Sequence, residues 1–172
     1  MSPILFFSIT SAVLLFGFII TGIIRFGFLN SYSGYSSKWG EAVPMNNMNL
    51  WSIVTIVAAF LIMPGLLEVG ALSMWQFLGF LVPVYLIVVA LTPDWMTNQG
   101  QWKVHASFAL LCAFCGLTWI FLVAKTPLIF STLLVFILTL GLLSGTLKRA
   151  LVFWIELLLF LSVYLIVILL LL

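Results

Sequence analysis

Two side chains of this sequence have the residue types needed for acid–base chemistry, His105 and Asp94. An imidazole that a carboxylate orients can act as a general base, and the polar stretch PDWMTNQGQWK, residues 93–103, lies between the two. A hydrolase would also need a nucleophile, and no nearby hydroxyl lies in a recognisable nucleophile motif. The pair therefore indicates an enzyme only as an alternative, a lipid-modifying membrane enzyme with His105 and Asp94 as its catalytic residues.

The composition limits metal and cofactor chemistry. His105 is the only histidine, so this chain alone cannot build a bis-histidine haem or a His-rich metal centre. Cys112 and Cys115 form a C-x-x-C pattern, as in membrane thiol oxidoreductases, but they lie in an apolar stretch and the chain has no second thiol pair for exchange. We interpret them as two small buried residues, and we predict no metal site and no cofactor.

The apolar composition places the chain in a lipid bilayer. Of 172 residues, 65% are hydrophobic and 6% are charged, with a mean hydropathy of +1.37, whereas about a quarter of the residues of a soluble domain are charged. At roughly 20 apolar residues for each crossing, the length suits six crossings and their loops. This excludes a nucleotide-binding domain and a disulfide scaffold, and we expect no nucleic-acid partner.

We predict an all-α fold, a polytopic integral membrane protein with a six-helix transmembrane bundle in a single domain, residues 1–172. The helices are expected at about residues 3–29, 50–72, 75–92, 104–124, 127–147 and 150–172. The first run is a membrane helix and not a cleaved signal, because no basic side chain precedes it and it continues for a full crossing to Arg25. The polar stretch 30–49 is expected to supply turns and an interfacial cap.

Small residues and prolines inside these helices predict how the bundle packs. Gly141 and Gly145 form a GxxxG pattern that lets another backbone approach closely, and we expect the partner to be a helix of the same bundle rather than a second copy. Pro64 and Pro83 are expected to kink adjacent helices. These kinks, with Glu68 or Glu156 as the acidic group, suggest a small proton-coupled transporter as a further alternative.

The charged residues gather on one side of such a bundle. The connections after the first, third and fifth helices carry Arg25, Lys38, Lys103, Lys148 and Arg149, and the opposite side has Lys125 alone. By the positive-inside rule these three connections face the cytoplasm and both termini lie on the other side. The cytoplasmic side also receives Glu41, Asp94, His105 and Glu156.

Glu156 is placed about one and a half turns inside the last helix. Ionisable groups at membrane depth usually pair, snorkel or line a wet cavity. We therefore predict that Glu156 faces the bundle with a cationic or hydrogen-bonding partner, for which Arg25, Arg149 and His105 are candidates.

The segment TPDWMTNQGQWKVHASFALLCAF has a Pro93-Asp94 loop that leads into a helix opened by His105, with Ala106 and Phe108 behind it. Together with the six-helix layout, this segment weakly resembles the family of the damage-regulated autophagy modulators and their bacterial look-alikes, over about residues 75–121. The resemblance implies a small polytopic protein linked to membrane or lipid homeostasis, with no catalytic residues to carry over.

The leading functional hypothesis is a non-enzymatic membrane protein that binds lipid headgroups or a membrane partner through a one-sided polar cluster. The ligand-binding residues expected in that cluster are Glu41, Asp94, His105, Glu156, Arg25 and Lys103. Its partners are expected to be membrane lipids, since each Lys or Arg near an anionic leaflet contributes about 1 kcal/mol.

Overall fold

The computed structural model describes residues 1–42, 49–92 and 98–172, and in these ranges it contains helices, turns and loops but no strand. The prediction of an all-α fold is confirmed. The helices are α1 (Pro3–Phe26), α2 (Tyr35–Ala42), α3 (Leu50–Val69), α4 (Phe77–Ala90), α5 (Gln99–Thr118) with its π-helical extension η1 (Trp119–Val123), α6 (Pro127–Leu143) and α7 (Leu151–Leu171).

Four of these helices are long and apolar enough to cross a membrane. They are α1, α3, the continuous helix Gln99–Val123 formed by α5 and η1, and α7. The two remaining apolar helices are shorter, with 14 residues in α4 and 17 in α6. The fold is therefore helical, and its four candidate spans are consistent with an integral membrane protein.

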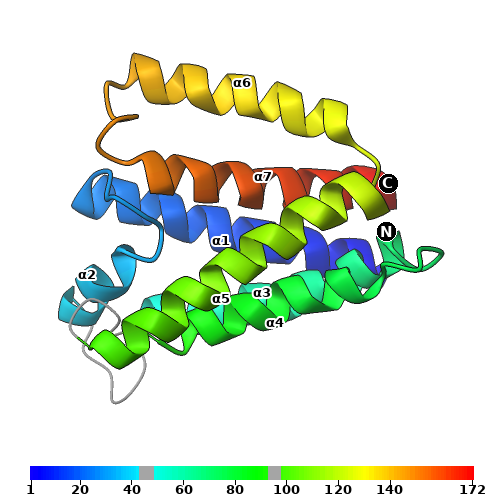
Figure 1. Cartoon of the computed structure of the whole chain (residues 1–172), viewed down its shortest axis with the longest axis horizontal. Coiled ribbons are helices and arrows are strands. Elements are labelled where there is room, and N and C mark those ends of the chain that lie inside the picture. Colours follow the sequence, from blue (N-terminus) through cyan, green and yellow to red (C-terminus); the bar gives the residue numbers. More distant parts are fainter. Residues whose placement is uncertain (43–48, 93–97) are drawn as a thin grey trace.

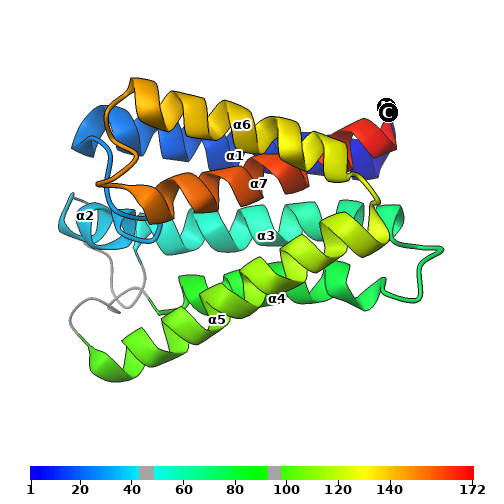
Figure 2. The same cartoon turned by 45° about the horizontal axis from the view of Figure 1, so that its top comes forward.

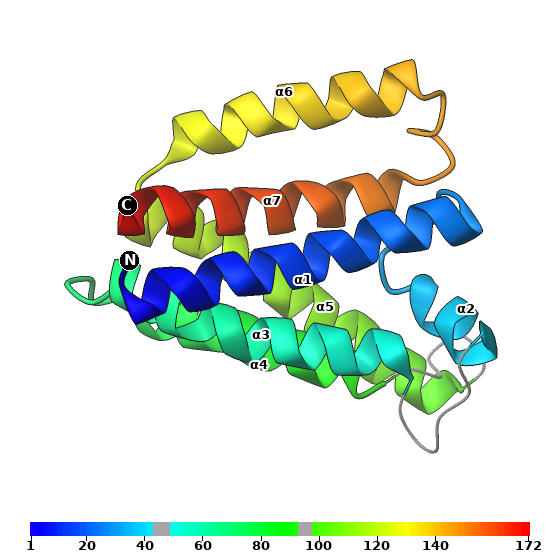
Figure 3. The ribbon, with the colours of Figure 1, turned by 180° about the vertical axis from the view of Figure 1, so that it is seen from behind.

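All helices except α2 run lengthwise beside one another (Figure 1). α1 packs against α3, α3 against α4 and α4 against α5, while α7 contacts α1, α3 and α5. α6 lies at the outside of the bundle (Figure 2) and packs chiefly on α7. Seen from behind, α1 lies between α7 and α3, and both chain termini are at the same end of the molecule (Figure 3). We call this the terminal end and the opposite one, which holds α2, the α2 end.

Several helix boundaries differ from the sequence-based expectation. α1 ends at Phe26 and not at residue 29, because Gly27 adopts a positive φ of 74° that closes the helix. α5 begins at Gln99, five residues before the predicted start, because the Asn98 side chain caps the N–H groups of Gly100 and Gln101. α6 stops at Leu143, since Gly145 has a φ of 65°.

The largest difference is the polar stretch after α1, which was expected to be an interfacial cap. Residues 31–36 are buried, and the chain continues from them into α2. This stretch has no apolar periodicity, because Ser and Gly alternate with Tyr. Its burial therefore depends on the helices around it and not on its own hydrophobicity.

Gly65 is where α1, α3 and α7 approach most closely. A Cβ atom added to Gly65 would collide with Ser8 Oγ of α1 and lie 2.7 Å from Val167 Cγ1 of α7. Both neighbours belong to packed helices, so the three backbones can keep this spacing only around a glycine.

Replacing Gly65 by Ala is expected to lower the free energy of unfolding by about 1–3 kcal/mol, the usual cost of overpacking a filled core. Thermal unfolding of the detergent-solubilised protein measures the loss. Gly17→Ala is the matched control in another helix, because nothing lies within 4 Å of the added Cβ, and it should leave the unfolding temperature unchanged or raise it. Equal effects of the two substitutions would contradict the packing described here.

Candidate functional site

The centre of the candidate site is the stretch of residues 30–36, which is buried from residue 31 onward and which we call the inserted segment. Its backbone is anchored to α7 at two points: Phe153 N–H donates to the carbonyl of Asn30 at 2.9 Å, and Tyr32 N–H donates to the carboxylate of Glu156 at 2.5 Å. Inside, Gly34 N–H donates to Ser31 O and Tyr35 N–H to Tyr32 O. The segment is thus held by hydrogen bonds that replace those lost to water.

Glu156 therefore faces the bundle, as predicted from its depth in the helix. Its partner is a backbone N–H and none of the expected candidates, Arg25, Arg149 and His105; in the described part of the chain the single ion pair is Lys38–Glu41. A carboxylate bonded to a main-chain amide fixes the position of that backbone. Glu156 has here the role of an anchor for the inserted segment.

The side chain of Tyr32 connects the inserted segment to α3 through a hydrogen bond. Its hydroxyl lies 2.8 Å from Thr55 Oγ1, and Thr55 donates its own hydrogen to the carbonyl of Trp51, so Tyr32 is the donor. The Tyr32 side chain is 3% exposed, and burial raises the pKa of its hydroxyl, which keeps the proton in place. The ring packs against Trp51 and Phe160.

Tyr35 and Asn49 connect the inserted segment to α1 and to α3. The Tyr35 hydroxyl donates to Gly27 O at 2.8 Å, its ring lies against Gly22 of α1, and burial raises the pKa of its hydroxyl. The Asn49 amide donates to Ser36 O and Ser36 Oγ, while its carbonyl oxygen caps α3 at Ser52. One asparagine thus joins the inserted segment to the start of α3.

His105 lies on the far side of Trp51 and is 5% exposed. Its ring is 6.4 Å from that of Trp51, and its Nδ1 is 2.9 Å from Thr92 Oγ1. Since Thr92 donates its single hydroxyl hydrogen to the carbonyl of Val89, the bond to His105 assigns the ring hydrogen to Nδ1. Glu156, Tyr32, Trp51 and His105 thus form a continuous line across the α2 end, from α7 to α5.

Three further predicted ligand residues, Glu41, Arg25 and Lys103, lie at the surface of the same end. Glu41 is exposed and pairs with Lys38 at 3.1 Å, one turn away in α2. The Arg25 guanidinium lies 5.2 Å from the centre of the Trp39 ring and 5.5 Å from that of Phe26, which positions it by cation–π contact. Lys103 is exposed in the first turn of α5.

Asp94 falls outside the described residues, so the His105–Asp94 pair and the enzyme alternative remain predictions. Among the described residues no group of three or more His, Cys, Asp or Glu side chains could hold a metal ion. Cys112 and Cys115 are free, and Cys112 Sγ lies 3.4 Å from the carbonyl of Val82, a contact between packed helices.

The bundle interior holds one more hydroxyl pair. Tyr164 of α7 lies 2.6 Å from Ser11 Oγ of α1, and Ser11 donates to the carbonyl of Ala58 in α3, also at 2.6 Å. Tyr164 is therefore the donor in its pair with Ser11, and the two bonds join three helices. Buried hydroxyls satisfied in this way contribute to helix association in a membrane.

Gly141 and Gly145 do not form the predicted helical motif, because Gly145 lies beyond the end of α6. A Cβ added to Gly141 would lie 2.8 Å from Leu147 and 3.4 Å from Trp154. Within the described chain, the neighbours of Gly141 are thus the α6–α7 connection and α7.

No protein-family model, curated protein or solved structure matches this chain. The resemblance to the damage-regulated autophagy modulators therefore stays a prediction.

Sequence reasoning missed the residues that build the network around the inserted segment, namely Tyr32, Tyr35, Asn49, Thr55, Thr92 and Trp51. A partial signal was present. Thr55 lies among apolar residues of α3, and Tyr32 and Tyr35 are three residues apart, a spacing that places both on one face of a helical turn.

Replacing Glu156 by Leu should lower the free energy of unfolding by about 1–3 kcal/mol, because the buried N–H of Tyr32 loses its acceptor. Glu156→Gln keeps an acceptor oxygen and should cost less. Thermal unfolding in detergent and limited proteolysis of the chain between α1 and α3 measure both effects. Glu41→Gln removes only an exposed pair and serves as control, with an expected change below about 0.5 kcal/mol. A Glu156→Leu variant as stable as the control would refute the anchoring role.

Proposed function

We propose that this chain is a multi-pass membrane protein that binds anionic lipid headgroups at its α2 end. The observation that supports the proposal is that Glu156 and Glu41 have partners within the protein, whereas most basic side chains of this end are exposed. Glu156 is directed inward to the backbone of Tyr32, and Glu41 is neutralised by Lys38. The four other basic side chains of this end are all exposed: Arg25, Lys103, Lys148 and Arg149.

Three of these side chains are supported from one corner of the bundle. Phe28, just after α1, stacks on Trp154 of α7 with ring centres 5.4 Å apart, and it also packs on Phe153. These contacts bring the end of α1, which carries Arg25, beside the α6–α7 connection, which carries Lys148 and Arg149. Basic groups fixed at the level of the headgroups favour phosphate-bearing lipids.

An exposed tryptophan of this end, Trp102, supports the same placement. Trp102 is half exposed beside Lys103 in the first turn of α5, and tryptophan is enriched where membrane and water meet. By the positive-inside rule, we propose that the α2 end faces the cytoplasm. The line from Glu156 to His105 then holds the end in shape while the basic side chains contact lipid.

Binding of phosphatidylglycerol to the protein in a neutral detergent, measured by native mass spectrometry, should exceed binding of phosphatidylcholine. The double variant Lys148→Gln/Arg149→Gln should weaken it by about thirtyfold, since each basic side chain contributes about 1 kcal/mol. Lys125→Gln, at the terminal end, is the matched control and should bind as the unsubstituted protein does. Equal binding of the two lipids, or an unaffected double variant, would refute the proposal.

We also propose that α4 and α6 cross the membrane, which gives six spans. The two helices measure about 21 Å and 26 Å at 1.5 Å per residue, against a hydrocarbon thickness of about 30 Å. Their connecting turns extend them, and each lies along a longer helix, α4 beside α3 and α6 beside α7. The shortfall is within what local thinning of the bilayer can accommodate.

Six spans place Ser73 and Lys125 on one side of the membrane and Lys103 and Ser144 on the other. Single cysteines at these positions, in a chain with Cys112 and Cys115 replaced by Ala, should react with an impermeant maleimide in those two groups. If α4 does not cross, positions 73 and 103 will react from the same side. If α6 does not cross, positions 125 and 144 will do so.

A further inference from the structure

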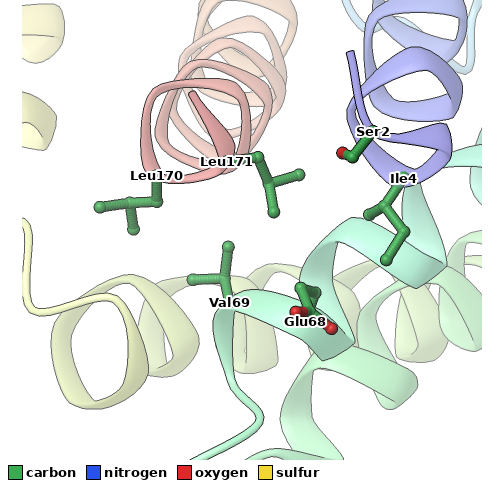
Figure 4. A pocket seen from close by; sticks show the side chains of 6 residues that line it. All are labelled: Ser2, Ile4, Glu68, Val69, Leu170 and Leu171. Carbon is green, nitrogen blue, oxygen red and sulfur yellow. The ribbon is translucent and has the colours of Figure 1, made fainter.

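The terminal end of the bundle contains a cavity of about 520 Å³ where α1, α3 and α7 meet. It is lined by Ser2 and Ile4 at the start of α1, Glu68 and Val69 of α3, and Leu170 and Leu171 of α7. Figure 4 shows these six side chains around one space, with Glu68 the one charged side chain among them and four aliphatic side chains around it. The volume lies within the usual range of small-ligand sites, about 300–1,000 Å³.

The electrostatics of this cavity favour a cation. Glu68 lies in the last turn of α3, where the helix dipole has its negative end. At the start of α1, Pro3 has no N–H, and the N–H groups of Leu5 and Phe6 both donate to Ser2. Among the six residues that line the cavity, Glu68 is the one with a charged side chain.

This charge is not neutralised from within the described chain. Glu68 is exposed, and the single ion pair of the described residues, Lys38–Glu41, lies at the α2 end. Lys125, the basic residue of the α5–α6 connection, and the amino group of Met1 make no ion pair with it. A carboxylate that opens into a cavity with aliphatic side chains on its other walls is complementary to a positively charged group that carries hydrocarbon.

We propose that the cavity binds an amphiphile with an ammonium group, which pairs with Glu68 while its alkyl chain lies against Ile4, Val69 and Leu171. The cavity lies at helix ends and not at their middle, so a ligand can keep its headgroup in water and its chain in the bilayer. The ammonium group can belong to a free alkylamine or to a lipid headgroup. The site is separate from the lipid-binding surface of the α2 end.

Isothermal titration of the protein in a nonionic detergent tests the proposal with two probes, decylammonium chloride for the free amine and dihexanoyl phosphatidylethanolamine for the lipid headgroup. At least one should bind with one-site saturation, and Glu68→Gln should weaken that binding at least fivefold. Glu41→Gln removes a carboxylate from the opposite end and is the matched control. Decanoate, with the same charge as the wall, should not bind above the detergent background.

The charge-reversed variant Glu68→Lys separates charge recognition from loss of shape, since it should bind decanoate and release decylammonium. Glu68 is exposed, so both variants are expected to fold, which circular dichroism checks. Saturation by neither cationic probe, or undiminished binding to Glu68→Gln, would overturn the proposal. Either result would leave the anionic-lipid surface of the α2 end unaffected, because Lys148 and Arg149 are tested separately with phosphatidylglycerol.

Discussion

A polar backbone placed between apolar helices must find a partner for each of its hydrogen-bonding groups, and the α2 end depends on this constraint. The inserted segment meets it with turns of its own and with acceptors and donors from three helices. Tyr32 is central, because its N–H bonds Glu156 and its hydroxyl bonds Thr55. An unpaired N–H buried between these helices would cost a few kcal/mol. The inserted segment can therefore stay buried only while its hydrogen-bond partners are in place.

The same constraint explains the charge distribution over the surface. Because Glu156 is used inside to hold a main-chain amide, it does not neutralise the basic side chains outside. The chain has few acidic residues, and another of them, Glu41, is paired within its own helix. Most of the exposed basic side chains therefore lie at the α2 end, and the terminal end carries the exposed carboxylate of Glu68. An apolar chain with so few charges thus obtains two chemically different ends.

Sequence patterns predicted the parts of this structure that depend on hydrophobicity. The apolar runs around α1, α3, α5 and α7 are continuous over a membrane thickness, and the helices form there. Helix ends were less predictable, because they depend on single residues: Gly27 and Gly145 take positive φ, and Asn98 caps α5.

The candidate site was predictable in its charged members and not in its geometry. The depth of Glu156 in an apolar helix predicted an inward-facing carboxylate, but no residue type identifies a main-chain N–H as its partner. Burial of residues 31–36 was missed for a related reason. The segment has a polar composition, and it is buried because the neighbouring helices surround it. Partners far apart in the sequence, such as Tyr32 and Glu156, leave no trace in local patterns.

That separation has a consequence for how the protein is made. Tyr32 and Glu156 are 124 positions apart, and at roughly 5–20 residues per second a ribosome completes the second about 6–25 seconds after the first. Throughout that interval α1 is already synthesised while the amide of Tyr32 still lacks the carboxylate it will bond. The inserted segment can form this anchoring bond only after α7 has been synthesised.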